Sequence, residues 1–60
     1  MAEDLYGNEI EVGDTVKISG ASNTYIVSDL HYGGEMADLV VSDYGNDRDG
    51  VRVHDLIKVG

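Results

Sequence analysis

Tyrosines that stand close to carboxylates are the residues of this sequence best suited to recognition chemistry. The triplet Val-Ser-Asp occurs at residues 27–29 and again at residues 41–43, and a tyrosine follows each copy, as Tyr32 and Tyr44. Aromatic rings supply contact area and carboxylates attract cationic side chains, a combination that suits a basic partner. We therefore expect a partner-binding surface on or beside loops, formed by Tyr25, Asp29, Tyr32, Asp43 and Tyr44.

No combination of residues predicts catalysis. Ser28, His54 and Asp55 are the residue types of a nucleophilic triad, but the sequence contains neither a nucleophile-elbow motif nor an oxyanion loop beside them. A chain of 60 residues also offers little volume for a cleft. We expect a protein that is not an enzyme and that has no catalytic residues.

Metal and cofactor sites are not predicted either. Residues 47–50 read Asp-Arg-Asp-Gly, like part of a calcium loop, but the full loop would need carboxylates at Gly45 and Leu56. His31 and His54 are far apart in a sequence without cysteine, so each is expected to be a surface histidine rather than a zinc ligand. We expect no metal and no cofactor.

The charge balance limits the classes of partner. Twelve Asp and Glu stand against four Lys and Arg, giving a formal net charge of −8. Binding to phosphates or to an anionic membrane surface needs the opposite balance, so direct nucleic-acid contact and membrane association are disfavoured. Two explanations of the acidity remain open: it keeps a small protein in solution, or it forms a face that meets a basic partner.

The N-terminus and the cysteine count bear on location. Residues 1–4 are acidic and no apolar run follows them, so neither a signal peptide nor a membrane span is predicted. The absence of cysteine fits a reducing compartment. We expect a small cytoplasmic protein whose 60 residues are the complete product.

Residues 10–20 are the stretch with the clearest local structure. Ile10, Val12, Val16 and Ile18 all occupy even positions, and Gly13-Asp14 interrupts the run with a turn signal. The pattern predicts an extended arm that turns into a half-buried strand. Further strands are predicted at residues 24–30, 36–42, 51–53 and 57–59, and a helical turn at residues 54–56.

Turn signals that recur after each short strand are typical of an all-β fold. In the second predicted strand Ile26, Ser28 and Leu30 share one face, and in the third Ala37, Leu39 and Val41 point inward. The expected architecture is a small five-stranded SH3-like (Src-homology-3-like) barrel with a short 3-10 turn before the last strand. Its predicted core is Ile10, Val12, Val16, Ile18, Ile26, Leu30, Leu39, Val41, Val51, Val53, Leu56 and Val59.

Residues 13–20, Gly-Asp-Thr-Val-Lys-Ile-Ser-Gly, resemble the opening of a KOW motif, a barrel found in ribosomal proteins and transcription elongation factors. The resemblance implies contact with nucleic acid or the ribosome. KOW motifs continue with lysines, whereas Ala21, Ser22 and Asn23 carry no charge here. The resemblance therefore predicts the fold and not the nucleic-acid contact.

A second resemblance is to Tudor domains. Residues 12–14, the Asp-Tyr-Gly-Asn turn at residues 43–46 and the later Asp-Leu at residues 55–56 are similar to the motifs of that family. Tudor domains bind methylated arginine or lysine in an aromatic cage. The resemblance implies cage positions at Tyr25, Tyr44 and Asn46, and it adds Asn46 to the expected partner-binding residues. Other aromatic positions of the family are occupied here by Gly20, Ala21 and Val41.

The sequence thus favours a non-enzymatic protein-binding module whose acidic, tyrosine-bearing loop face contacts a basic segment of another protein. Two alternatives stay open: an acidic nucleic-acid mimic of the phage type that inhibits a DNA- or RNA-binding enzyme, and a small structural component of a phage or other assembly. Residues 1–8 are expected to form a flexible acidic lead-in, and residues 9–60 a single SH3-like barrel domain. The oligomeric state is left open.

Overall fold

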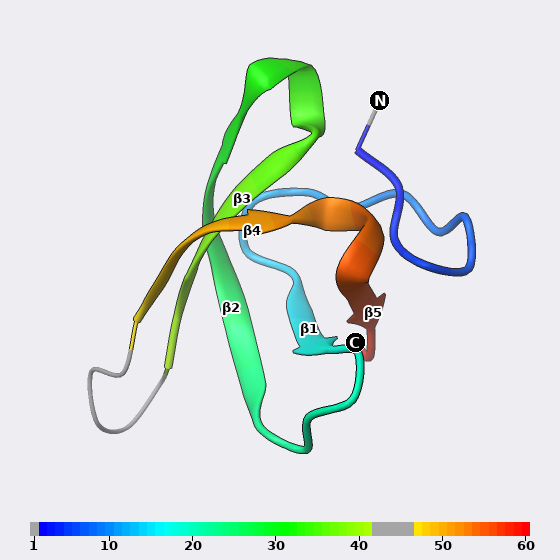
Figure 1. Cartoon of the computed structure of the whole chain (residues 1–60), viewed down its shortest axis with the longest axis vertical. Helices are drawn as coiled ribbons and strands as arrows, with labels where there is room; N and C mark the ends of the chain where they lie inside the picture. The colour runs from blue at the N-terminus through cyan, green and yellow to red at the C-terminus, as the bar shows by residue number, and fades with distance from the viewer. Residues whose placement is uncertain (1, 42–46) are drawn as a thin grey trace.

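The computed structural model describes residues 2–41 and 47–60 and is shown in Figure 1. Five strands of the described residues form one antiparallel sheet in the order β4-β3-β2-β1-β5. Two short 3-10 turns, η1 and η2, stand before β3 and β5. The predicted all-β class, the five strands and the 3-10 turn before the last strand are confirmed. The elements are β1 (Thr15–Ile18), β2 (Thr24–His31), η1 (Tyr32–Gly34), β3 (Met36–Val40), β4 (Arg48–Arg52), η2 (Val53–Asp55) and β5 (Leu56–Lys58).

The predicted turn before the first strand is present. Gly13 has a φ of 98°, a left-handed conformation that favours glycine. The Asp14 carboxylate accepts a hydrogen bond of 2.8 Å from the Glu11 backbone N–H, which holds the turn closed. Val16 then lies in the core and Ile18 packs against it, as the even-position pattern predicted.

The predicted inward face of the second strand is wrong in its first half. Tyr25 and Val27 are buried, and Ile26 is only partly buried. The pairing of β2 with β3 shifts register between Val27 and Asp29, and after the shift Leu30 packs against the core. This β-bulge inserts an extra residue, so the strict alternation assumed from the sequence does not hold across it.

The membership of the core differs from the prediction. Val12 and Val59 are 59% and 45% exposed. Val12 lies in the turn that precedes β1 and Val59 lies beyond the end of β5, so neither is held by a strand facing the core. The buried apolar residues are Ala2, Ile10, Val16, Tyr25, Val27, Ala37, Leu39, Val53 and Leu56, with Ile18, Leu30, Val41 and Val51 packed against them.

Strand limits differ most at β4. The sequence assigned residues 43–50 to a polar turn and residues 51–53 to a strand, but β4 spans Arg48–Arg52 and pairs with β3. Pairing with a neighbouring strand overrides the weak strand propensity of Asp49 and Gly50. The helical turn and the last strand each begin one residue earlier than predicted, at Val53 and Leu56.

Residues 2–10 contact the sheet. Ala2 is buried in the core, and its carbonyl accepts a 2.8 Å hydrogen bond from the Ile10 backbone N–H. The Leu5 N–H donates to the Leu56 carbonyl at 2.8 Å, so this segment borders β5. The division into a flexible lead-in and a domain at residue 8 stays a prediction. Within residues 2–41 and 47–60 no helix is long and apolar enough to cross a membrane.

Asp4 is the buried polar residue among those described, with 2% of its surface exposed. Its Oδ1 accepts hydrogen bonds from the backbone N–H groups of Tyr6 and Asn8 at 2.9 and 2.8 Å. Its Oδ2 accepts from the Lys58 backbone N–H at 2.8 Å and from Asn8 Nδ2 at 3.2 Å. Burial alone would raise the pKa of Asp4, but these hydrogen bonds outweigh it and hold the pKa below its ordinary value.

Candidate functional site

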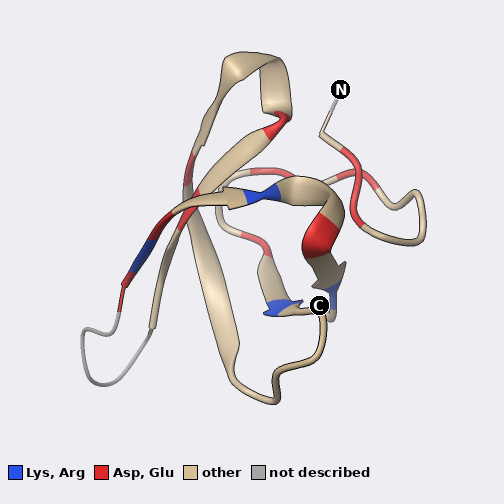
Figure 2. Cartoon of the chain, viewed as in Figure 1, with Lys and Arg blue, Asp and Glu red and all other residues tan. Residues whose placement is uncertain are grey.

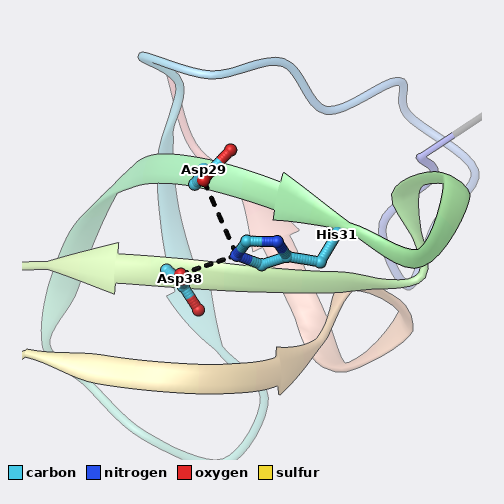
Figure 3. Close-up of side chains that lie close together, drawn as sticks. All are labelled: Asp29, His31 and Asp38. Carbon is cyan, nitrogen blue, oxygen red and sulfur yellow. Dashed lines mark hydrogen bonds and ion pairs between the residues drawn. The ribbon is translucent and has the colours of Figure 1, made fainter.

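The pairing of β2 with β3 brings three polar side chains together on the sheet. Asp29 lies directly opposite Asp38 in the register of the two antiparallel strands. His31 stands two residues beyond Asp29, on the same side of β2, because side chains alternate along a strand. Figure 3 shows the imidazole extending along the strands so that one ring nitrogen approaches both carboxylates.

The Nε2 atom of His31 is the centre of this cluster. It lies 2.7 Å from Asp38 Oδ2, a short hydrogen bond, and 3.6 Å from Asp29 Oδ2. One oxygen of each carboxylate and this nitrogen all lie within 4.8 Å of one another. The three side chains are partly exposed, Asp38 least, at 28%.

Backbone groups orient both carboxylates. The other oxygen of Asp38 accepts a hydrogen bond of 3.1 Å from the Gly50 N–H of β4. The other oxygen of Asp29 accepts one of 2.9 Å from the Leu30 N–H. Ser28 donates from its hydroxyl to the Asp38 carbonyl at 3.1 Å. Each carboxylate therefore keeps one oxygen directed at His31.

These contacts change the acid–base properties of the pair. The side-chain hydrogen bond to Asp38 raises the pKa of His31 above its ordinary value, desolvation opposes the rise, and the negative charges of Asp38, Asp29 and Asp49 add to it. The hydrogen bond with His31 lowers the pKa of Asp38, and the one from Gly50 lowers it further.

Tyr32 extends this surface at the turn between β2 and β3. Its side chain is 81% exposed, and its ring centroid lies 6.4 Å from that of His31. Its φ of 56° is a left-handed conformation that bulky residues rarely adopt. Gly33 and Gly34 follow with φ of 69° and 92°, so η1 is a tight turn through three consecutive left-handed residues.

The residues expected from the sequence to bind a partner have different locations. Asp29 and Tyr32 both belong to the surface around His31. Tyr25 lies in β2 opposite Val16 and is 3% exposed, so its ring is part of the core rather than of an exposed loop face. Asp43, Tyr44 and Asn46 lie outside the described residues, and the cage positions that the Tudor resemblance implies at Tyr44 and Asn46 stay predictions.

Sequence reasoning did not identify His31 and Asp38 as part of the site. The spacing of Asp29 and His31 was a usable signal, because residues two apart on a strand face the same way. Asp38 could not be added from spacing alone, since its place opposite Asp29 depends on the strand register and on the bulge at Val27.

The carboxylates of the described residues extend beyond this cluster. Figure 2 shows acidic residues along β2, β3 and β4 and along the N-terminal segment, with basic residues on β1, β4 and β5. Lys58 is neutralised in part, because its Nζ lies 3.6 Å from Asp14 Oδ2. Asp29 and Asp38 meet no Lys or Arg side chain in the described residues and are balanced only by His31.

The site thus lies on the exposed side of β2 and β3, at the end of β2 that leads into η1. No protein-family model, curated protein or solved structure in these comparisons matches the chain.

Proposed function

We propose that this chain is a non-enzymatic protein-binding module, and that a surface formed by Asp29, His31, Tyr32 and Asp38 contacts a basic segment of a partner protein. The observation that carries the proposal is Tyr32, a tyrosine 81% exposed on a left-handed backbone, whose ring neighbours that of His31, the residue that contacts both carboxylates. We call these four residues the Tyr32 surface.

The conformation of Tyr32 supports a role in recognition. A non-glycine residue in the left-handed region costs about 1–2 kcal/mol, and such strain collects at functional sites. Glycine would adopt this conformation without strain, and glycine occupies the next two positions of the turn. Position 32 nevertheless carries a tyrosine. The strained conformation presents the ring to solvent, next to the imidazole of His31.

The charges of the Tyr32 surface support a cationic ligand. An arginine or lysine side chain can pair with Asp29 or Asp38 and lie against the face of Tyr32, because ring faces attract cations. Tyrosine and carboxylate groups at the centre of an interface contribute strongly when the partner covers them. The formal net charge of −8 adds long-range attraction for a basic segment.

We also propose that the sheet closes into an SH3-like barrel of the Tudor and KOW kind. Support comes from the strand order β4-β3-β2-β1-β5, which places the last strand beside the first, and from η2 immediately before β5. The long strand β2 pairs with β1 through residues 24–26 and with β3 through residues 26–31, and a bulge within the second pairing bends it (Figure 1).

The proposed binding can be tested with a defined probe. A short synthetic peptide of alternating Arg and Gly residues is titrated into the isotope-labelled protein, and amide chemical shifts are followed by NMR. We expect saturable shifts centred on residues 28–38. A matched peptide of alternating Glu and Gly should cause none. Shifts scattered evenly over all acidic residues would contradict a specific surface.

A variant separates recognition from folding. Tyr32→Asn keeps a side chain that tolerates positive φ and removes the ring. We expect the Arg-Gly peptide to bind about tenfold more weakly, since an anchoring tyrosine is worth at least 1–2 kcal/mol. The control is Tyr6→Asn, at a tyrosine 71% exposed on the N-terminal segment. Equal affinities for the two variants would show that Tyr32 is not the contact.

A further inference from the structure

We propose that Asp29, His31 and Asp38 form a binding site for a divalent transition-metal ion of the zinc type. This goes beyond the proposed function, because it requires no protein partner. The sequence predicted no metal site, since His31 has no second histidine or cysteine nearby. Strand pairing supplies the missing ligand by placing Asp38 across from Asp29.

The register of β2 and β3 places two carboxylates where a cation would stabilise them. Asp29 and Asp38 are directly opposite each other on antiparallel strands, an arrangement in which like charges repel. Neither has a Lys or Arg partner in the described residues. The group between them is the neutral or singly charged imidazole of His31. A divalent ion coordinated by all three side chains would offset the repulsion more completely.

The donor atoms lie within about an ångström of the spacing that a small ion requires for one of the two His31 contacts, and at that spacing for the other. Ligands about 2.0–2.2 Å from a tetrahedral zinc ion lie roughly 3.3–3.6 Å from one another. His31 Nε2 is 3.6 Å from Asp29 Oδ2 and 2.7 Å from Asp38 Oδ2, and the three donor atoms lie within 4.8 Å. Shifts of about an ångström in exposed side chains are sufficient to open the His31–Asp38 contact and admit an ion.

The surroundings of the donors are those of an oriented ligand set. Asp38 is held through its other oxygen by the Gly50 N–H of β4, and Asp29 by the Leu30 N–H. Hydrogen bonds of this kind outside the ligand shell fix the direction of coordinating carboxylates. They come from strands β4 and β2, so the sheet positions both ligands.

The ligand types define the class of ion. An imidazole nitrogen with two carboxylate oxygens suits zinc, cobalt, nickel or copper, whereas Ca²⁺ and Mg²⁺ prefer oxygen ligands alone. Three protein ligands leave at least one coordination position open, as at zinc sites that retain a water molecule. Since the cluster is exposed, that position faces solvent.

Isothermal titration calorimetry and NMR with metal salts alone test the proposal on the full chain. We expect ZnCl₂ to bind at one ion per chain, with shifts of the His31 ring and of the amides of residues 29–31 and 38. MgCl₂ at the same concentration should produce no comparable shifts. Zinc binding that is no stronger than magnesium binding, or shifts centred on other carboxylates, would overturn the proposal.

Matched variants assign the ligands. Asp29→Asn and His31→Gln each remove one donor, and we expect the zinc affinity to fall about tenfold or more, because even groups outside the ligand shell are worth ten- to hundredfold. Asp49→Asn removes a nearby carboxylate that only adds charge near His31, and His54→Gln removes the other histidine. Both should bind zinc as the parent does.

An equal loss of affinity in all four variants would show diffuse attraction by net charge and refute the site. Circular dichroism of each variant checks that the fold is intact, and a single unfolded variant leaves the other ligand variant to decide. No peptide or protein partner takes part, so a negative result leaves the proposed protein-binding function unaffected.

Discussion

At the scale of single residues, Tyr32 and Asp4 depart from ordinary preference, Tyr32 in its backbone conformation and Asp4 in its burial. Tyr32 has a φ of 56° and is exposed, whereas Asp4 is a carboxylate with 2% of its surface exposed. The burial of Asp4 is compensated by four hydrogen bonds, three from Tyr6 and Asn8 and one from the distant Lys58 backbone. No comparable contact in the described residues compensates the backbone strain of Tyr32. We therefore assign the strain at Tyr32 to recognition, and the buried carboxylate of Asp4 to stability.

Replacing Tyr32 should therefore stabilise the protein. We expect Tyr32→Gly to raise the free energy of unfolding by up to about 1 kcal/mol, because relief of the left-handed strain exceeds the entropy lost by a new glycine. Urea denaturation followed by circular dichroism measures the change. A loss of stability would mean that the exposed ring makes a structural contact, and it would weaken the case for recognition.

Replacing Asp4 should destabilise the folded protein. Asp4→Asn keeps the shape but places an amide where a carboxylate accepts hydrogen bonds from three backbone N–H groups. We expect a loss of about 2–3 kcal/mol in the free energy of unfolding, as for hydrogen bonds to a buried charged group. Glu3→Gln, at an exposed carboxylate of the same segment, is the control and should change little.

The contribution of Asp4 should also depend on pH. Its folded pKa is lowered from 3.8, so its stabilisation is present above that value and is lost as the pH falls below 3.8 and through the lower folded pKa. Acid unfolding curves should show a large difference between the parent and Asp4→Asn at neutral pH that shrinks toward pH 3. A difference that is independent of pH would contradict the ionised state of Asp4.

At the scale of elements, the turns and strands could largely be predicted from the sequence, and the facing of β2 could not. Gly13-Asp14 and Gly33-Gly34 mark turns by residue type alone, and both are found. Tyr25, Ile26 and Val27 are three consecutive apolar residues, so alternation does not decide which of them face the core. The bulge that decides it arises from pairing with β3.

The same reason limited the prediction of the candidate site. Asp29 and Tyr32 were found from a local pattern, because Asp29 ends the first Val-Ser-Asp triplet and Tyr32 follows it. His31 and Asp38 interact across two strands, and the partner of a strand residue depends on a register that no local pattern fixes. Tyr25 was expected on or beside a loop, but it lies within β2 with its ring in the core, on the face opposite to the one that the sequence assigned as inward.

The η1 turn offers a prediction at this scale. Gly33 and Gly34 both have positive φ, but only at Gly34 would an added Cβ lie 3.0 Å from Ala2. We expect Gly33→Ala to lower the free energy of unfolding by about 1–2 kcal/mol through backbone strain, and Gly34→Ala to lower it further by displacing Ala2. Equal losses, measured by urea denaturation, would show that Ala2 is not held against the turn in solution.

At the scale of the whole molecule, net charge opposes folding. A formal charge of −8 on a chain of 60 residues creates repulsion that is stronger in the compact state than in the unfolded one. The ion pair between Lys58 and Asp14 offsets only a small part of it. The stability of this protein should therefore be set partly by the ionic strength of the solution.

Salt should stabilise the fold and weaken peptide binding at the same time. The Debye length is about 10 Å at 0.1 M and about 3 Å at 1 M, so added NaCl screens both repulsion within the chain and attraction for a basic partner. We expect the thermal midpoint to rise, and the affinity for the Arg-Gly peptide to fall, between low salt and 0.5 M NaCl. A midpoint that falls with salt would show that favourable ion pairs dominate instead.

The hydrogen bond between Asp4 and the Lys58 backbone joins positions 54 residues apart in the sequence. During synthesis Asp4 leaves the ribosome early, and the N–H group that it needs is added only near the end of these 60 residues. The strand β5, which carries that group, is also the strand that pairs with β1. The fold thus cannot be completed until β5 has been added and has left the ribosome, and the apolar strands that precede it stay unprotected until then.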